Sequence, residues 1–220
     1  MNTIKIITTH DGSPSLWNEE LQETYHSRHG AIQESVHVFI KQGLDQVGHL
    51  QTVRVLEIGL GTGLNAWLTA SWAIRNQKAV QYYTLERYPV PDSIWRQLNY
   101  TQVATESTLF QNIHLAPWQQ WSQLNSYFSI YKAEESLQEV VLKDWQVDLI
   151  YFDAFAPNKQ PEMWELPMLK KVIATLSKGG VFVTYCAKGQ FKRDLKSFEM
   201  KVESLPGPPG KREMVRAIKL

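Results

Sequence analysis

The sequence predicts an α/β fold built around an open, mostly parallel sheet. Short apolar runs of strand length alternate along the chain with amphipathic stretches of helical spacing, and a glycine cluster at residues 59–63 directly follows one of the runs. The chain should end in an antiparallel pair of strands, residues 201–205 and 213–218, joined by a glycine- and proline-rich loop. With 220 residues, 43% of them hydrophobic, one sizeable core is expected.

The first fifty residues predict a small addition to this core. Residues 3–9 and 15–17 read as a hairpin around a turn at 10–12. A helix should follow, because apolar residues recur there at helical spacing: Ile32, Val36, Phe39, Ile40 and Leu44. The chain is therefore expected to be one domain, with residues 1–50 as the N-terminal addition and residues 51–220 as the core.

The core elements are predicted from apolar periodicity and from proline and glycine positions. Of two strand-like runs in the region 99–132, residues 128–131 are favoured over residues 113–115 as the core strand. The expected order is strand 53–58, helix 64–76, strand 80–85, a helix from 91–92, strand 128–131, an acidic helix 134–142, strand 147–152, helix 161–176, strand 181–185 and a basic helix 191–198.

Charge is distributed unevenly although the net charge is only +1. Residues 170–220 carry 12 Lys and Arg against 4 Asp and Glu, so the rest of the chain is acidic. A basic C-terminal quarter suggests a surface for a polyanion, because phosphate contacts rely on Lys and Arg. The alternative is an ordinary set of solvated helix faces.

Several classes of protein are disfavoured by composition. Residues 1–9 alternate apolar and polar side chains and lack the apolar core of a secretory signal, and no later run reaches membrane-spanning length, so a cytoplasmic protein without a membrane partner is expected. The single cysteine, Cys186, excludes an intrachain disulfide and reads as a buried strand residue. The six histidines show no zinc-ligand spacing, so no metal is expected.

The glycine loop predicts a nucleoside cofactor site. Gly59, Gly61 and Gly63 let the backbone turn sharply and lie against a ligand. Carboxylates stand at three strand ends: Glu86 is expected to hold ribose hydroxyls, Glu57 the charged amino-acid end of the cofactor, and Glu134 the adenine amino group. A dinucleotide site is the alternative, but the dinucleotide glycine fingerprint is incomplete.

The sequence Asp-Ala-Phe-Ala-Pro at residues 153–157 predicts the catalytic centre, because it follows a buried strand where α/β sheets place ligands. Asp153 is expected to accept a hydrogen bond from a neutral amine and orient it for in-line displacement, while also lying against the cofactor, and Phe155 to stack on a flat base. The alternative is a capping aspartate beside a core phenylalanine.

Together with residues 25–31, 158–164, 184–189 and 207–214, the 153–157 segment resembles the MnmC/MnmD methyltransferases over nearly the whole chain. The resemblance implies a class I S-adenosylmethionine-dependent methyltransferase fold, Rossmann-like with a seven-stranded, mostly parallel sheet. It also implies methyl transfer from S-adenosyl-L-methionine to the 5-aminomethyl nitrogen of wobble 5-aminomethyl-2-thiouridine in tRNA. The two-domain members add a flavin-dependent oxidase, for which this chain has no length, so the chain resembles a stand-alone methyltransferase, with the aminomethyl substrate supplied by a separate oxidase or by upstream tRNA-modifying enzymes.

Five basic residues are predicted to contact the tRNA backbone: Lys188, Lys192, Arg193, Lys211 and Arg212. Roles for His26, Arg28 and His29 stay open, with a phosphate or carboxylate contact one option. Two other functions remain alternatives. A polyamine-synthase-like amine transferase would show a Gly-Gly-Gly-Asp loop where this chain has Gly-Leu-Gly-Thr, and a non-catalytic RNA-binding module would not bind the cofactor.

Overall fold

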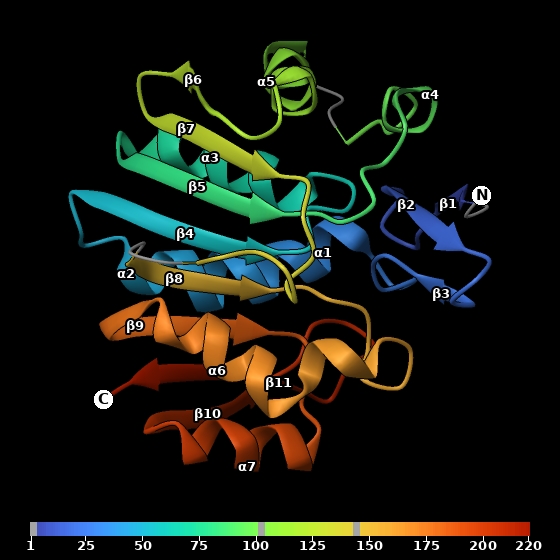
Figure 1. Cartoon of the computed structure of the whole chain (residues 1–220). Coiled ribbons are helices and arrows are strands. Elements are labelled where there is room, and N and C mark those ends of the chain that lie inside the picture. The colour runs from blue at the N-terminus through green and yellow to red at the C-terminus, as the bar shows by residue number, and fades with distance from the viewer. Residues whose placement is uncertain (1–3, 101–103, 143–145) are drawn as a thin grey trace.

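The computed structural model describes residues 4–100, 104–142 and 146–220. Within these residues a central sheet has eight strands in the order β10-β11-β9-β8-β4-β5-β7-β6 (Figure 1). The five central strands β9, β8, β4, β5 and β7 run parallel, and antiparallel strands close both edges. The strands are β4 (Thr52–Ile58), β5 (Ala79–Leu85), β6 (Trp121–Asn125), β7 (Phe128–Ala133), β8 (Val147–Phe152), β9 (Leu176–Thr184), β10 (Met200–Pro206) and β11 (Glu213–Lys219).

Helices cover both faces of the sheet, which explains why its central strands are apolar on both sides. All six residues of β8 are buried. One face carries α1 (Ala31–Ser35), the π-helix η1 (Val36–Leu44), α2 (Asp45–Val47), α3 (Leu64–Asn76) and α5 (Ala104–Leu115). The other carries the 3₁₀-helix η2 (Pro161–Trp164), α6 (Leu166–Ala174) and α7 (Gly189–Ser197). Helix α4 (Asp92–Trp95) is a single turn after β5.

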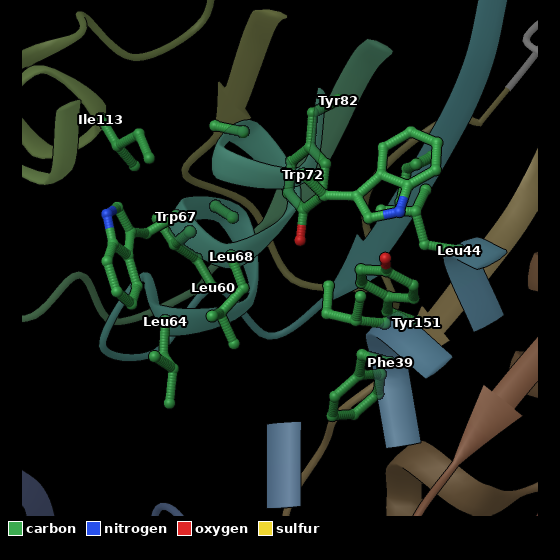
Figure 2. Packing of buried hydrophobic residues seen from close by; sticks show 14 of the residues in the cluster. Phe39, Leu44, Leu60, Leu64, Trp67, Leu68, Trp72, Tyr82, Ile113 and Tyr151 are labelled. Atoms are coloured by element: carbon green, nitrogen blue, oxygen red, sulfur yellow. The ribbon is translucent and has the colours of Figure 1, made fainter. Parts of the chain in front are cut away.

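The core on the α3 face joins the N-terminal segment to the sheet. Phe39 of η1 packs on Tyr151 of β8, with ring centroids 5.1 Å apart, and Trp67 and Trp72 of α3 lie in the same cluster (Figure 2). The indole of Trp72 donates to Asp45 of α2 at 2.8 Å. The helical segment of η1 and α2 is thus packed into the main core.

A second, three-stranded sheet holds the start of the chain: β1 (Ile4–Thr8), β2 (Pro14–Asn18) and β3 (Glu23–Thr24). It lies beyond the carboxyl ends of the central strands, to the right of their arrowheads in Figure 1. Because open α/β sheets bind ligands at that edge, the small sheet stands over the expected site.

Most predicted elements are confirmed. Helix α3 and strand β8 have the predicted bounds. β4, β5, β7, α7, β10 and β11 differ from prediction by one or two residues at an end, and β1 and β2 form the predicted hairpin. The mostly parallel α/β sheet is also confirmed, but it has eight strands where seven were expected, because β6 adds an antiparallel edge that sequence patterning missed. Every helix in the described residues is too short or too polar to cross a lipid bilayer.

Two local predictions are wrong. Residues 134–142 form turns instead of an acidic helix, because Ser136 and Glu139 hydrogen-bond to one another in a local turn. The helix expected over 161–176 is broken at Glu165, since Pro167 lacks the N–H that a continuous helix would need, and residues 176–180 already belong to β9. The choice of residues 128–131 over residues 113–115 as the core strand is confirmed, because 128–131 lie in β7 and 113–115 end helix α5.

Candidate functional site

A cavity of about 980 Å³ opens at the carboxyl ends of β4, β5 and β8. Its floor is made by the segments that follow these three strands, and the residues around β3 line it from the opposite side. Loop 206–212, between β10 and β11, contributes Lys211. Segments far apart in the sequence therefore converge on one site, as the predicted position of the glycine loop and of residues 153–157 requires.

The glycine loop is shaped by close backbone approaches. Gly59 has φ +94°, and a Cβ there would lie 2.9 Å from the backbone oxygen of Asp153. Only glycine allows the segments after β4 and β8 to come so close. Gly61 donates its N–H to Glu86 Oε2 at 2.9 Å. Gly59 and Gly61 line the cavity, whereas Gly63 does not: it starts helix α3, with His114 against it.

Glu86 lies in the cavity where the sequence predicts a ribose-binding carboxylate. Its two oxygens each accept one backbone N–H at 2.9 Å, from Gly61 and from Tyr88. These bonds fix the carboxylate and leave each oxygen with further acceptor capacity. Burial raises the pKa of Glu86, and the backbone hydrogen bonds oppose that rise.

Two of the predicted carboxylates lie elsewhere. Glu57 is fully buried in the core beneath the glycine loop and does not line the cavity. Glu134 is exposed and also outside the cavity, because the segment after β7 turns its next residues inward instead. The cavity residues there are Glu135, Ser136, Leu137 and Gln138. The predictions that Glu57 and Glu134 contact a cofactor directly are therefore at odds with this geometry.

Asp153 stands at the centre of the floor. Its N–H donates to Ile58 O at 3.0 Å, and its Oδ2 accepts from Asn65 Nδ2 at 2.9 Å. Burial, with a smaller contribution from the Glu34 carboxylate, raises the pKa of Asp153 to about 7. A carboxyl group with this pKa can accept a proton near neutral pH, which suits a base or an orienting acceptor.

The turn after Asp153 is held from three sides. Tyr185 donates its hydroxyl to Ala154 O at 2.8 Å, and Trp164 donates its indole N–H to Phe155 O at 2.8 Å. Phe155 meets Tyr25 edge to face, with ring centroids 5.1 Å apart, and both rings line the cavity. A planar group entering here would find an aromatic wall.

A partly buried ion pair, Glu34 with Lys211, lies in the cavity wall. Lys211 Nζ lies 2.6 Å from Glu34 Oε1 and 3.7 Å from the centroid of the Tyr185 ring. The second Glu34 oxygen accepts Ser27 N–H at 2.6 Å. His26 is buried beside this pair, bonded to Ser15 Oγ at 3.0 Å, and its burial lowers its pKa to about 4. His26 is therefore neutral near pH 7.

The predicted RNA-binding residues do not form one group. Lys188, Arg193 and Arg212 are exposed, and Lys192 is ion-paired with Glu213 at 2.6 Å. Lys211 lies in the cavity wall, paired with Glu34, and so stands apart from the other four residues. Arg28 and His29 are exposed. Arg28 lies over the Trp17 ring, and His29 packs against Gly210.

Sequence reasoning gave no role to four residues that shape the site: Tyr25, Glu34, Asn65 and Tyr185. Asn65 had a usable signal, since it is a polar residue on the first turn of a helix that is buried from Leu64 to Ala73. Glu34 gave none, because its partner Lys211 is 177 residues away. Among the described residues, no group of three or more His, Cys, Asp or Glu is arranged to hold a metal ion.

These features fit a nucleoside cofactor. The backbone at Gly59 and Gly61 is free of side chains toward the cavity, and a fixed carboxylate, Glu86, faces the same space. Beyond it, Tyr88 and Pro89 supply apolar lining for a base. The remaining part of the cavity, around Asp153 and Phe155, is large enough for an acceptor group beside the cofactor.

Comparison with known proteins agrees with this geometry. A family model described as S-adenosyl-L-methionine-dependent methyltransferase matches residues 93–220, more than half of the chain. The chain is 25% identical over 218 residues to the tRNA 5-methylaminomethyl-2-thiouridine biosynthesis bifunctional protein MnmC of Nitrosospira multiformis, covering 91% of this chain and 35% of that protein. It is 26% identical over 223 residues to the protein of the same name from Marinomonas sp., covering 93% and 32%.

The chain thus spans about a third of the length of these relatives. A crystal structure of MNMC2 from Aquifex aeolicus superimposes with a TM-score of 0.80 at 23% identity, covering 99% of this chain and 70% of that one, which supports the fold. The loop and carboxylate that fit a nucleoside, and the family model over the C-terminal half, lead to one conclusion: this chain belongs to the S-adenosyl-L-methionine-dependent methyltransferases.

Proposed function

We propose that this protein transfers a methyl group from S-adenosyl-L-methionine to the 5-aminomethyl nitrogen of wobble 5-aminomethyl-2-thiouridine in tRNA, giving 5-methylaminomethyl-2-thiouridine. The observation that carries the proposal is Asp153, a carboxyl with a pKa near 7 at the floor of the cavity, beside the glycine loop and an aromatic wall. The relatives named for 5-methylaminomethyl-2-thiouridine biosynthesis support the choice of acceptor.

The charge of the cavity supports an amine acceptor. Seven carboxyl groups line it, against three side chains that carry positive charge, Arg87, Lys159 and Lys211. An acidic pocket favours a cationic or neutral amine over an anionic acceptor, and it repels phosphate. The nucleobase would therefore enter the pocket while its backbone phosphates stay outside, as in enzymes that take a base out of its stack.

Asp153 has the central role in this proposal. Bound S-adenosyl-L-methionine supplies an electrophilic methyl group on a sulfonium sulfur. The acceptor amine must present a free lone pair, so Asp153 accepts one N–H of the amine and takes its proton when the amine arrives protonated. Phe155 and Tyr25 hold the pyrimidine ring so that the nitrogen is aligned for in-line attack.

The other side chains bind and position. Glu86 receives ribose hydroxyls, and the backbone of Gly59 and Gly61 lies against the cofactor. We assign the adenine amino group to the segment 135–138 rather than to Glu134. In this proposal the aminomethyl acceptor comes from an earlier tRNA-modifying step, which a flavin-dependent oxidase can supply by removing a carboxymethyl group from the amine.

Contacts to the tRNA backbone are proposed for the exposed basic residues Lys188, Arg193 and Arg212, with Lys192 at their edge. They belong to the basic C-terminal quarter, which has an excess of positive charge over the acidic remainder. Because such contacts release counterions, binding of tRNA should weaken as salt rises.

The test is incubation of the protein with labelled methyl donor and tRNA that carries the 5-aminomethyl group, followed by nucleoside mass spectrometry. We expect label in 5-methylaminomethyl-2-thiouridine and none in tRNA whose wobble amine has been acetylated. Label on another nucleoside, or on free polyamines but not on tRNA, would contradict the proposal.

A further inference from the structure

Beneath the cavity floor, three polar side chains form a line from the core to the site. Glu57, at the end of β4, is fully buried, and Asn65, on the first turn of α3, is buried beside it. Asn65 Nδ2 donates to Asp153 Oδ2 at 2.9 Å. The amide therefore stands between the buried carboxyl and the carboxyl proposed to meet the substrate.

Three buried polar atoms in or beside this line make no hydrogen bond of normal geometry: Glu57 Oε1, Asn65 Oδ1 and the Tyr82 hydroxyl. The other Glu57 oxygen, Oε2, accepts from Thr84 Oγ1 at 2.8 Å. A buried polar atom without a partner is destabilising, because it loses its hydrogen bonds to water and gains none in return. Glu57 Oε1 and Asn65 Oδ1 are both acceptors when Glu57 is ionised, so they cannot satisfy one another unless a proton is added.

A single proton on Glu57 gives all three atoms a hydrogen-bond partner. With Glu57 protonated on Oε1, its O–H donates to Asn65 Oδ1, the Tyr82 hydroxyl donates to Oε1, and Thr84 keeps its bond to Oε2. We infer that Glu57 is a neutral carboxylic acid that positions Asn65 and, through it, Asp153, and that it is not a cofactor ligand. This inference deepens the proposed function, on which it rests for the role of Asp153.

The direction of the Asn65 amide then decides where the negative charge lies. A protonated Glu57 holds Oδ1 toward itself, which turns Nδ2 toward Asp153 and favours an ionised carboxylate at the cavity. An ionised Glu57 would attract Nδ2, reverse the amide and favour a protonated Asp153. Asn65 therefore supports an ionised Asp153 only while Glu57 is protonated.

The surroundings of Glu57 favour the protonated form. Burial raises its pKa to about 8, and the Asp153 charge adds to the rise, whereas Thr84, Tyr82 and Asn65 oppose it. Tyr151, on β8, is the further titratable group that faces it. The pKa of Asp153, about 7, is the lower of the two, so Asp153 loses its proton first. At neutral pH the negative charge is therefore expected on Asp153 rather than on Glu57.

The first experiment needs no tRNA. Infrared difference spectra of the protein between pH 6 and pH 10 are compared for wild type, Glu57→Gln and, as a matched control at the neighbouring strand end, Glu86→Gln. Besides the band of Asp153, which is lost near pH 7, we expect a protonated-carboxyl band that is lost with a midpoint near pH 8 in wild type and in Glu86→Gln and that is missing in Glu57→Gln. Calorimetric titration with S-adenosyl-L-methionine should give near wild-type affinity for Glu57→Gln and weakened affinity for Glu86→Gln.

The second experiment follows the pH profile of methyl transfer. Glu57→Leu should lower kcat by about 10- to 100-fold through misplacement of Asp153, and Glu57→Gln, a neutral isostere, should restore most of it. Wild-type kcat should fall above pH 8 as Glu57 ionises, and Glu57→Gln should lack this fall. Circular dichroism checks that each variant is folded.

Loss of cofactor affinity in folded Glu57→Gln would overturn the inference, because it would make the Glu57 charge a cofactor ligand. An infrared band unchanged by Glu57→Gln would overturn it as well, as would an alkaline fall in kcat that survives the substitution. If no tRNA is methylated by wild type, the proposed acceptor fails, and the infrared spectra and the cofactor titration still decide the state of Glu57.

Discussion

The two sides of the cavity are built in different ways. On the cofactor side, the glycine loop and Glu86 come from the ends of the paired strands β4 and β5 and are joined by a single direct bond, Gly61 N–H to Glu86. On the acceptor side, Tyr25, Asp153 and Lys211 come from the N-terminal sheet, the end of β8 and a loop near the C-terminus. The first side is local, and the second is assembled from distant segments.

This difference separates what each side needs in order to form. The cofactor side depends on backbone conformation within about thirty residues, so a short motif specifies it. The acceptor side depends on long-range contacts, such as the Glu34–Lys211 ion pair and the Tyr25–Phe155 ring contact. Substitutions on one side should therefore leave the other intact, except where the two sides touch.

Asp153→Asn should show the largest difference between its effect on turnover and its effect on cofactor affinity. It removes the acceptor for the amine proton and keeps the side-chain volume, so we expect kcat to fall by about 10²- to 10⁴-fold. The affinity for S-adenosyl-L-methionine, measured by calorimetry, should stay near wild type, because the cofactor side is built independently. Equal losses of turnover and of cofactor affinity would show that the sides are not separable.

Gly59→Ala tests the place where the two sides touch. A Cβ at this position would lie 2.9 Å from Asp153 O, and the residue has φ +94°. We expect about 1–3 kcal/mol of lost folding stability together with weakened cofactor binding and slower turnover. Chemical denaturation and calorimetry measure both effects. Gly179→Ala, at φ +76° with open space around the added methyl, is the matched control that should cost stability alone.

Glu57→Gln should change the pH dependence of the free energy of unfolding. Glu57 has a folded-state pKa of about 8, raised above the usual carboxyl range, so folding stability is lost as the pH rises from about 4.5 to 8. The Gln variant lacks this loss. We expect its stability relative to wild type to increase by about 2–4 kcal/mol between pH 5 and pH 9, measured by urea denaturation. A parallel pH dependence in the two proteins would argue against a buried neutral acid.

The smallest effects should separate Lys211 from the exposed basic residues. Lys188→Ala combined with Arg193→Ala should weaken tRNA binding and lower the slope of its salt dependence by about 1–2 phosphate contacts. Lys211→Met should leave that slope unchanged while reducing kcat, because Lys211 is paired inside the cavity wall. Filter binding at several salt concentrations tests both. An equal change of slope in the two variants would place Lys211 at the RNA.

Short-range patterns in the sequence were sufficient to predict the central strands and helix α3. The apolar runs of β4, β5 and β8 and the amphipathic spacing of α3 predicted the central sheet, because a strand buried on both faces must be apolar throughout. Positive φ at Gly59 and Gly61 follows from the glycine spacing of one short motif, and Glu86 was predicted from its place at the end of the next strand. The position of Asp153 after a buried strand also needed only local patterning.

Which polar groups line the cavity depends on long-range packing, so it could be seen only in the folded chain. Glu57 and Glu86 both stand at strand ends, yet Glu86 lines the site whereas Glu57 is buried among Asn65 of α3 and Tyr82 and Thr84 of β5. Lys211 and Arg212 are neighbours in sequence, yet Lys211 pairs with Glu34 in the cavity wall whereas Arg212 is exposed to solvent. A side chain's environment depends on partners brought from far along the chain, and that information is absent from any short segment.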